Sequence, residues 1–238
     1  LTITGTRFNN NYGGNGGAAI YIDHSDATAS LTDCYFIGND GSSSYGSTIR
    51  TAADINITDC VFLNNNDNIF GGTSPYSTSA NITILNSIVW KNTLMSTSWS
   101  NMNLTATYSC IQEVYPGTGN ISSNPQFCNP FEDLLSLVAS SPCIGTGWYN
   151  ENMGGLSIGC EYATTLFYIS EDGLSSGTGT LENPLLSITN TILFLNDGDT
   201  VLVLPGTYVE NIDYNGKSIV LGSQLLTTGD TSYVSSTI

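Results

Sequence analysis

The sequence predicts an all-β protein, a right-handed parallel β-helix (β-solenoid) with a short capping helix. A first observation is a template that recurs four times in residues 1–92: an apolar residue, a second apolar residue five positions later, and an asparagine three positions after that. The second apolar positions are 28 (36 − 8), 26 (62 − 36) and 27 (89 − 62) residues apart, as in solenoids whose every turn is one repeat. The β-type apolar runs are short and separated by Gly, Asn and Ser, and the leucine-dense template of leucine-rich repeats is missing.

Two columns of apolar side chains are expected to fill the solenoid. Cys34 and Phe36, for example, are two positions apart, so both side chains point to one face of a strand. Stacked turns lie roughly 4.8 Å apart, and equivalent residues therefore form ladders. A second strand in each turn is predicted around Ile20 and Ile49. The predicted core ladders are Ile3, Leu31, Ile57 and Ile84, and Phe8, Phe36, Phe62 and Val89.

An asparagine ladder is predicted at one corner of the turns. Asparagine tolerates the left-handed backbone that a sharp corner requires, and its side-chain amide can bond the copies above and below it. The alternative is that these asparagines merely mark loops, but their fixed offset from the apolar positions favours a ladder. Its members are Asn11, Asn39, Asn65 and Asn92.

The composition limits the partners of the chain. It has 238 residues, of which 40% are hydrophobic, so one long domain or two smaller ones can form. Four Lys and Arg face 20 Asp and Glu, for a net charge of −16, which argues against nucleic acid and anionic membrane surfaces. No apolar run reaches the length of a membrane span, so we expect no membrane insertion. Six cysteines in a chain this poor in Lys indicate an oxidising compartment, extracellular or at the cell surface.

The chain is expected to have three regions: β-helix turns in residues 1–100, an irregular C-terminal cap in 101–162, and the start of a second β-helix in 163–238. The middle region has four motifs in order, which are YSCI, NISSNPQF, LVASSPCIGTG and IGCEY, beginning at Tyr108, Asn120, Leu137 and Ile158. This order resembles the C-terminal part of the bacterial right-handed β-helix proteins grouped as choice-of-anchor Q domains. The resemblance implies a cap that closes the first solenoid.

The six cysteines are candidate disulfide partners. Cys34 and Cys60 share a ladder position where stacked Cα atoms fall within disulfide distance, although they can equally form a buried thiol ladder. The other four stand in the motif region, where the resemblance would place Asp or small apolar residues, and we interpret them as staples. These four are Cys110, Cys128, Cys143 and Cys160.

Residues 163–238 look like the opening of another β-helix of the same kind. Asn183 is expected to cap a short helix that begins at Pro184 and plugs the end of the second solenoid. Asp197 and Asp199 in the NDGDT turn are interpreted as structural, because Asp in such turns bonds backbone amides. The apolar helix positions are Leu185, Ile188, Ile192 and Leu195, and the first strands are expected at Val201–Leu204, Thr207–Val209 and Ile219–Leu221.

This organisation favours a structural or adhesive function. Residue 1 enters directly in the repeat and the chain stops within a second solenoid, so we expect copies to join head to tail in a fibre or tandem surface array. The sequence leaves open whether that junction is covalent. The expected junction residues are Leu1, Ile3 and Phe8 on one side, and Ile219, Leu221, Val234 and Ile238 on the other.

The alternative function is a carbohydrate-binding or polysaccharide-degrading β-helix. Asp33 and Asp59 occupy equivalent positions on adjacent turns, but the basic residues that surround the carboxylates of β-helix polygalacturonases do not follow them, and we nominate no catalytic residue. Glycans are a candidate partner, since exposed aromatic residues can stack on sugars or simply cover corners. The aromatic candidates are Tyr12, Tyr45, Tyr76, Trp90, Trp99 and Trp148.

No cofactor and no metal site are predicted. His24, the only histidine, stands in a turn without a second histidine or a cysteine cluster beside it. Calcium is the one candidate ion, because Asp23 and Asp26 offer oxygen ligands, although turn aspartates need no ion. Glycosylation sequons occur at Asn56, Asn81, Asn103 and Asn120, and in an Asn- and Thr-rich chain most of them are expected by coincidence.

Overall fold

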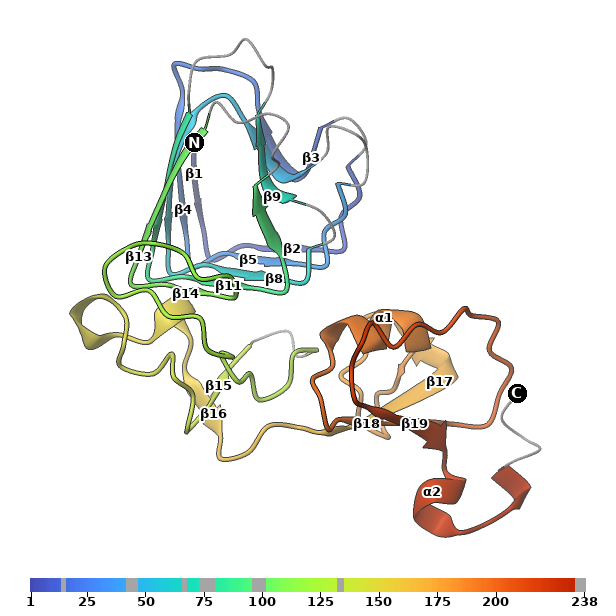
Figure 1. Cartoon of the computed structure of the whole chain (residues 1–238). Coiled ribbons are helices and arrows are strands. Elements are labelled where there is room, and N and C mark those ends of the chain that lie inside the picture. The colour runs from blue at the N-terminus through green and yellow to red at the C-terminus, as the bar shows by residue number, and fades with distance from the viewer. Residues whose placement is uncertain are drawn as a thin grey trace. The chain divides into compact units, whose positions relative to one another are not determined.

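A computed structural model describes residues 1–13, 16–41, 47–65, 68–72, 80–95, 102–131 and 135–233 (Figure 1). The chain divides into two compact units. Unit 1 comprises Leu1–Gln126 and Ala139–Gly159, and unit 2 comprises Phe127–Val138 and Cys160–Ile238. Their boundaries do not coincide with the three regions expected from the sequence, because parts of the motif region belong to each unit.

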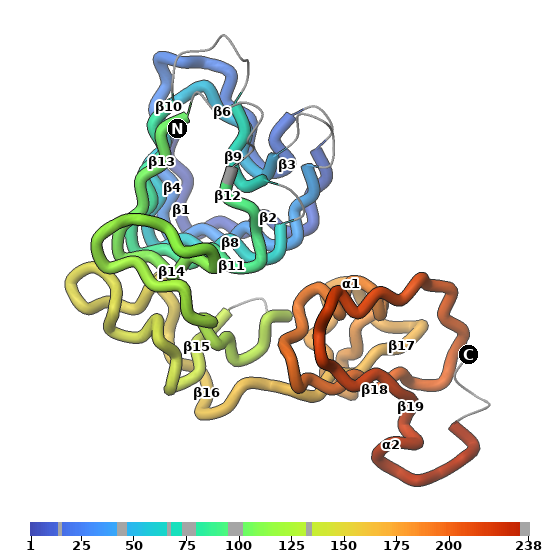
Figure 2. The backbone as a smooth tube through the Cα atoms, in the orientation of Figure 1, coloured from blue at the N-terminus to red at the C-terminus, as the bar shows by residue number. Residues whose placement is uncertain are grey.

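Unit 1 is a parallel β-solenoid, and the predicted fold class is confirmed. The first four turns each contribute one strand to each of three sheets, and the fifth turn contributes to two of them; Figure 1 shows the sheets as three walls and Figure 2 as stacked coils of the backbone. Sheet A contains β1 (Thr2–Thr4), β4 (Thr28–Thr32), β7 (Asp54–Thr58), β10 (Ala80–Leu85) and β13 (Met102–Thr107). Sheet B contains β2 (Arg7–Asn9), β5 (Tyr35–Ile37), β8 (Val61–Leu63), β11 (Ile88–Trp90) and β14 (Cys110–Ile111). Sheet C contains β3 (Gly17–Ile22), β6 (Ser47–Thr51), β9 (Asn68–Gly72) and β12 (Thr93–Met95).

The interior of the solenoid consists of continuous apolar columns. In sheet A, Ile3 pairs with Leu31, then Ile57, Ile84 and Ala106 in successive strands. In sheet B, Phe8 pairs with Phe36, then Phe62, Val89 and Ile111. The phenyl rings stack face to face at centroid distances of 4.8 and 4.6 Å, so the spacing of the turns also sets the packing of the core.

The last turn of the solenoid is closed by residues 112–121. Tyr115 packs against the core, and its hydroxyl donates to the Leu104 carbonyl at 2.8 Å. Asn120 donates from Nδ2 to the Ala106 carbonyl at 2.9 Å and accepts from the Ser109 amide at 3.0 Å. These bonds satisfy backbone groups on the outer edge of the fifth turn. This closing loop is short, whereas the whole of residues 101–162 was expected to be an irregular cap.

Unit 2 contains a second, shorter parallel sheet. Its strands are β17 (Leu166–Leu174), β18 (Thr200–Val203) and β19 (Val220–Ser223), with Phe167 paired to Val201 and Val201 to Leu221. The predicted strand at Thr207–Val209 is wrong, because these residues form no ladder and Val209 is 94% exposed. The remaining elements of the chain are β15 (Leu137–Val138), η1 (Trp148–Asn150), η2 (Met153–Gly155), β16 (Ile158–Cys160) and α2 (Leu225–Thr228).

The predicted capping helix is α1 (Ile188–Phe194), which packs its apolar side against the core of unit 2. The predicted cap Asn183 is wrong, since the N-cap is Ser187, whose side chain accepts from the Asn190 amide. Glu210 adds to this cap by accepting from the amides of Ile188 and Thr189 at 3.0 and 2.9 Å. The helix therefore starts where two acceptors satisfy its free amides, and not at the proline.

Candidate functional site

The outer face of sheet A is a grid of small polar side chains. Alternation along each strand points one set of residues inward and the other outward. Among the outward residues, only Asp54 is charged and only Leu85 is apolar. Strand pairing aligns them in three columns: Thr28, Asp54, Asn81 and Asn103; Thr2, Ser30, Asn56, Thr83 and Thr105; and Thr4, Thr32, Thr58, Leu85 and Thr107.

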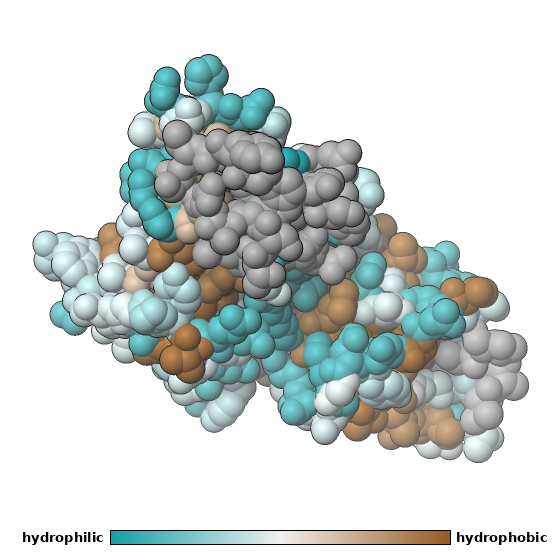
Figure 3. Space-filling view, turned by 45° about the horizontal axis from the view of Figure 1, so that its top comes forward, coloured by the Kyte–Doolittle hydropathy of each residue, from teal (hydrophilic) through white to brown (hydrophobic). Residues whose placement is uncertain are grey.

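The first two columns are exposed except at Ser30, the third column is half-buried except at Thr4, and part of the face is ordered by hydrogen bonds. Asn81 donates from its amide and from Nδ2 to Asp54 Oδ1, at 2.7 and 3.1 Å. Asn103 Nδ2 donates in turn to Asn81 Oδ1 at 3.2 Å. Figure 3 shows hydrophilic residues along the left edge of unit 1, the side on which sheet A lies in Figure 1. Three sequons, at Asn56, Asn81 and Asn103, lie on this face.

The outer face of sheet B is apolar where the chain covers it. Its outward residues Val61, Leu63 and Ile88, in the third and fourth turns, are at most 1% exposed, whereas the first turn places the polar residues Arg7 and Asn9 on the same face. Residues 143–156, which we call the covering segment, lie against this face. A Cβ on Gly154 would stand only 3.0 Å from Val61 Cγ2 and 3.1 Å from Ile88 Cδ1. Glycine at this position allows the backbone of the segment to approach sheet B closely.

The covering segment is fastened at the corner between sheets A and B. Asn86 is its main anchor, because its carbonyl accepts from the Gly154 amide at 2.6 Å and its Oδ1 accepts from the Trp148 amide at 3.1 Å. A Cβ on Gly147 would stand 1.8 Å from Asn86 Oδ1, so no other residue fits there without displacement. Met153, in the middle of the segment, is fully buried. The motif region thus covers a lateral face of unit 1.

The predicted carboxylate pair, Asp33 and Asp59, lies at this same corner. Both residues have left-handed backbone, with φ of 52° and 55°. The Asp59 carboxylate accepts from Asn86 Nδ2 at 2.5 Å. Burial raises the pKa of Asp59, Asn86 lowers it in part, and the charges of Asp33 and Glu151 raise it further. A Cβ on Gly155 would stand 3.1 Å from Asp33 Oδ1, so the covering segment packs beside the pair, of which Asp33 is exposed and Asp59 half-buried.

Beside this corner runs a ladder of thiols and hydroxyls. The Cys34 amide donates to Cys60 Sγ at 3.4 Å, the Cys60 amide to Ser87 Oγ at 3.1 Å, and the Ser87 amide to Ser109 Oγ at 3.1 Å. Each side chain also donates to the carbonyl two residues before it. Cys34 and Cys60 are free thiols in this structure, which corresponds to the thiol-ladder alternative: their sulfur atoms serve as the hydroxyl groups do in the next turns.

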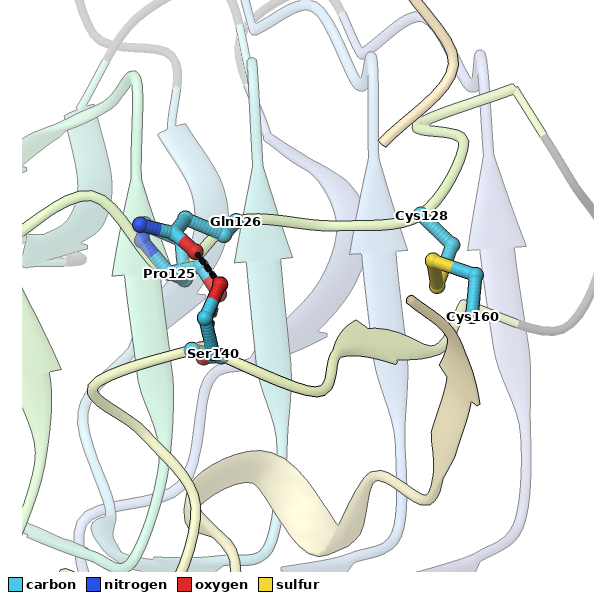
Figure 4. Close-up of a disulfide and its surroundings, with 6 residues drawn as sticks. Pro125, Gln126, Cys128, Ser140 and Cys160 are labelled. Carbon is cyan, nitrogen blue, oxygen red and sulfur yellow. Dashed lines mark hydrogen bonds between the residues drawn. A yellow bond between two sulfur atoms is a disulfide. The ribbon is translucent and has the colours of Figure 1, made fainter. Parts of the chain in front are cut away.

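The remaining cysteines form two kinds of pair. Cys128 and Cys160, in unit 2, form a disulfide with a Cα–Cα distance of 5.9 Å (Figure 4). It is the only disulfide among the residues that the structure describes. Cys110 and Cys143, in unit 1, are free and buried thiols, so only two of the four cysteines interpreted as staples are disulfide-bonded in this structure. Near Cys143, Ser140 Oγ donates to Gln126 Oε1 at 3.0 Å, which ties the chain on either side of residues 127–138 (Figure 4).

The asparagine ladder is continuous and its hydrogen bonds are saturated. Nδ2 of Asn11, Asn39 and Asn65 donates to Oδ1 of the asparagine in the next turn, at 2.8, 2.9 and 2.9 Å. The same Oδ1 atoms accept the backbone amides of those residues at 3.1, 3.0 and 2.8 Å. The second Nδ2 hydrogen of Asn39, Asn65 and Asn92 reaches the phenylalanine carbonyl of the preceding turn. Asn39 and Asn65 are buried, so this column holds the corner from within.

The left-handed backbone expected at the ladder asparagines lies one residue earlier in each turn. The residues with positive φ are Asn10, Gly38, Asn64 and Lys91, at 50°, 62°, 51° and 55°. Each of them turns the chain, and the following asparagine then points inward with an ordinary backbone. The sequence spacing located the asparagine column, but it did not show that the residue with positive φ precedes the asparagine that makes the hydrogen bonds.

The other candidate residues are scattered. His24, Asp23 and Asp26 lie in one exposed turn, and the described part of the chain contains no group of three or more His, Cys, Asp or Glu arranged to hold a metal ion. Tyr12 is 72% exposed, Trp90 is half-buried, and Trp148 packs edge-on against Tyr108 at a centroid distance of 4.8 Å. Tyr45, Tyr76 and Trp99 lie outside the described residues.

The residues expected at a head-to-tail junction are only partly described. Leu1 is exposed, while Ile3 and Phe8 are half-buried on the edge strands β1 and β2. Ile219 and Leu221 pack against the core of unit 2. Val234 and Ile238 lie outside the described residues. Asp197 accepts from the Ser218 amide and Asp199 from the Asn196 amide, as expected of turn aspartates.

Comparisons with protein-family models, with curated proteins and with solved structures found no match for this chain. The likeness of its motifs to choice-of-anchor Q domains therefore stays an expectation from the sequence. Within the described ranges, no helix has the length and apolar character needed to span a membrane.

Proposed function

We propose that the chain is an extracellular structural and adhesive β-solenoid, and that it binds its target through the outer face of sheet A. The observation that supports this proposal is the contrast between two lateral faces of unit 1. The apolar face of sheet B is covered by the chain itself, whereas the polar grid of sheet A stays open. A regular open face built from rigid strands is suited to extended contacts with a partner.

The chemistry of this face favours an uncharged, hydroxyl-rich polymer. Asp54 is its only charged side chain in a chain of net charge −16, so the face offers little to an ionic partner of either sign. Threonine hydroxyls and asparagine amides both donate and accept hydrogen bonds. The columns repeat once per turn, at roughly 4.8 Å, so a linear polymer along the axis would meet the same groups repeatedly. A neutral polysaccharide meets these requirements.

Fixed side chains make such a face effective even though each contact is weak. The threonines stand on paired strands, and β-branching restricts χ1, so little rotamer freedom is left to lose on binding. The Asp54–Asn81–Asn103 column is already ordered by its own hydrogen bonds. Affinity would then come from many equivalent contacts along the polymer.

An extracellular or cell-surface location is supported by the Cys128–Cys160 disulfide. Disulfides persist in oxidising compartments and are rare in the reducing cytosol. The low number of Lys and Arg fits the same interpretation, since the chain carries no basic footprint for nucleic acid.

Assembly along the solenoid axis is the second part of the proposal. Strands β1, β2 and β3 are edge strands of their sheets, so a further turn can pair with them. That turn can belong to the same polypeptide or to another copy. Electron microscopy combined with denaturing electrophoresis separates the cases: filaments that dissolve to single chains indicate non-covalent stacking, a much larger band indicates a tandem array, and isolated particles contradict axial assembly.

An enzymatic function receives less support from the geometry. Gly155 packs beside the candidate carboxylates, and Asp59 is half-buried and accepts a hydrogen bond from Asn86. A glycosidase needs its two carboxyl groups free to face the sugar from opposite sides. We therefore assign Asp59 to the support of Asn86, which anchors the covering segment.

The proposal is tested by incubating the chain with insoluble neutral polysaccharides, such as cellulose, chitin and mannan, and with a polyuronate gel of matched surface area. We expect depletion from solution by at least one neutral polymer, weak dependence on salt, and no release of reducing ends. Salt-sensitive binding to the polyuronate alone would contradict the assigned face, and steady release of reducing ends would favour the enzymatic alternative. Binding to none of the polymers would contradict the adhesive function.

A further inference from the structure

Two buried thiols meet between the solenoid and the covering segment. Cys110 lies on β14, in the outward column of sheet B that also contains Ile88. Cys143 begins the covering segment, and both residues are 0% exposed. Both belong to unit 1. Their sequence positions are 33 residues apart (143 − 110), so the contact joins separate parts of the chain.

Several contacts bring the two cysteines to the same place. The Met153 amide donates to the Cys143 carbonyl at 2.9 Å, and the adjacent Gly154 is packed on Ile88, the register partner of Cys110. The Cys110 thiol donates to the Ser123 carbonyl at 3.1 Å, and the Cys143 side chain is its neighbour on the other side. Interaction with Cys143, followed by burial, raises the pKa of the Cys110 thiol.

The other thiol pair in unit 1 has a different role. Cys34 and Cys60 directly precede the neighbouring strands β5 and β8, whose pairing already joins the two turns, and each sulfur accepts or donates within the corner ladder. Cys110 and Cys143 have no strand pairing between them, and the covering segment is held by the few contacts around Asn86. A covalent bond would therefore add a constraint at the second pair that the first pair does not need.

Conditions that preserve one disulfide also favour a second. The Cys128–Cys160 bond implies an environment in which thiols in contact are oxidised. We propose that Cys110 and Cys143 form a second disulfide that fastens the covering segment to the last turn of the solenoid. The pair described by the structure is its reduced form.

The reaction is thiol–disulfide exchange with a small-molecule disulfide, such as glutathione disulfide. The thiolate of one cysteine attacks a sulfur atom of the reagent, forms a mixed disulfide and releases one thiol. The second cysteine then attacks the protein sulfur of that mixed disulfide and releases the second thiol. Two protein thiols lose their protons, one protein S–S bond forms, and the reagent is reduced to two thiols. Because both cysteines are buried in the folded chain, the exchange occurs before the covering segment closes.

The experiment is to refold the full chain with a mixture of oxidised and reduced glutathione and then alkylate the remaining thiols. Proteolysis at acidic and aromatic residues and mass spectrometry then identify the linked peptides. We expect peptides joined through Cys110 and Cys143 in the same sample in which Cys128 and Cys160 are joined, while Cys34 and Cys60 are recovered alkylated. Recovery of Cys110 and Cys143 as alkylated thiols beside an intact Cys128–Cys160 bond, or their linkage to other cysteines, would overturn the proposal.

A second measurement does not depend on peptide recovery. The Cys110→Ser/Cys143→Ser variant should melt about 5 °C below the oxidised wild type, because a disulfide that closes a loop of this size constrains the unfolded chain. The matched variant Cys34→Ser/Cys60→Ser should show the same number of disulfides as the wild type. An unchanged count of disulfides in Cys110→Ser/Cys143→Ser would contradict the assignment even if that variant folded poorly.

Discussion

The outer faces of sheets A and B are formed by the same turns, but the first is open to solvent and the second is covered by residues 143–156. In one turn, Thr83 points outward from β10 and Ile88 points outward from β11, only five residues later. Thr83 is exposed, while Ile88 is 0% exposed beneath the covering segment. The inward residues of both strands are equally apolar. The inward columns therefore specify the solenoid, and the outward residues specify which face the chain covers and which face it leaves for a partner.

The largest difference between the two faces is expected when the same charge is placed on each of them. Ile88→Asp should lower the free energy of unfolding by about 4 kcal/mol or more, because it buries an unpaired carboxylate under the covering segment. Thr83→Asp should change it by less than about 1 kcal/mol, because that side chain stays in water. Chemical denaturation of the two variants provides the measurement. Equal losses would show that sheet B is open as well.

The same contrast between a buried and an exposed position can be tested with two asparagines. Asn65→Ala should cost about 3 kcal/mol, because the Asn39 amide and Nδ2 lose their acceptor and the Phe36 carbonyl loses its donor. The control is Asn56→Ala on the outer face of sheet A, where we expect a change below about 0.5 kcal/mol. Thermal unfolding of both variants tests the difference, and comparable values would contradict the ladder as a structural element.

The fit of the covering segment can be probed at its closest backbone approach. Gly147→Ala should cost about 2 kcal/mol, because the added methyl group overlaps Asn86 Oδ1 and pushes the segment away from its anchor. Gly16→Ala is the matched control, since nothing lies within 4 Å of a Cβ there. Stability measurements should show a loss only for the first variant. Dye binding to newly exposed apolar surface should increase for the same variant.

The smallest effect concerns the charge at the corner between the two faces. Burial raises the pKa of Asp59, so its protonation stabilises the fold below about pH 4, and this contribution is lost as the pH rises through the folded-state pKa. Asp59→Asn removes the charge and can still accept from Asn86. Its gain in free energy of unfolding over the wild type should be greater at pH 7 than at pH 3, by less than about 1 kcal/mol, and chemical denaturation at the two pH values measures it. A larger gain at pH 3 would contradict the sign of the shift.

The sequence was sufficient for the inward columns because they repeat with each turn. One apolar residue and one asparagine at a fixed offset align Phe36 with Phe62 and Asn39 with Asn65 without any knowledge of the loops between them. The outward residues follow no comparable rule. Nothing in the spacing around Val61 and Ile88 states that residues 143–156 cover them, because that contact joins parts of the chain far apart in sequence.

The other differences between the sequence predictions and the structure arise where neighbouring or equivalent residues can serve the same role. The corner places the left-handed backbone at Asn64 and the side-chain ladder at Asn65, and two adjacent asparagines cannot be told apart by composition. Helix α1 starts at Ser187 because Glu210, from beyond β18, supplies acceptors that the local sequence does not contain. Cys60 serves the same role as Ser87 in the next turn, so its ladder position indicated geometry but not oxidation state.

The proposal that the outer face of sheet A is the binding surface is tested most directly by comparing two variants of equal charge. Thr83→Glu/Thr105→Glu puts two carboxylates in the central column of that face, and Val114→Glu/Val209→Glu puts them at positions that are 89% and 94% exposed and lie outside it. Depletion by insoluble neutral polysaccharide should fall at least about tenfold for the first variant and stay at the wild-type level for the second. Equal binding by both variants, or no binding by the wild type, would contradict the account.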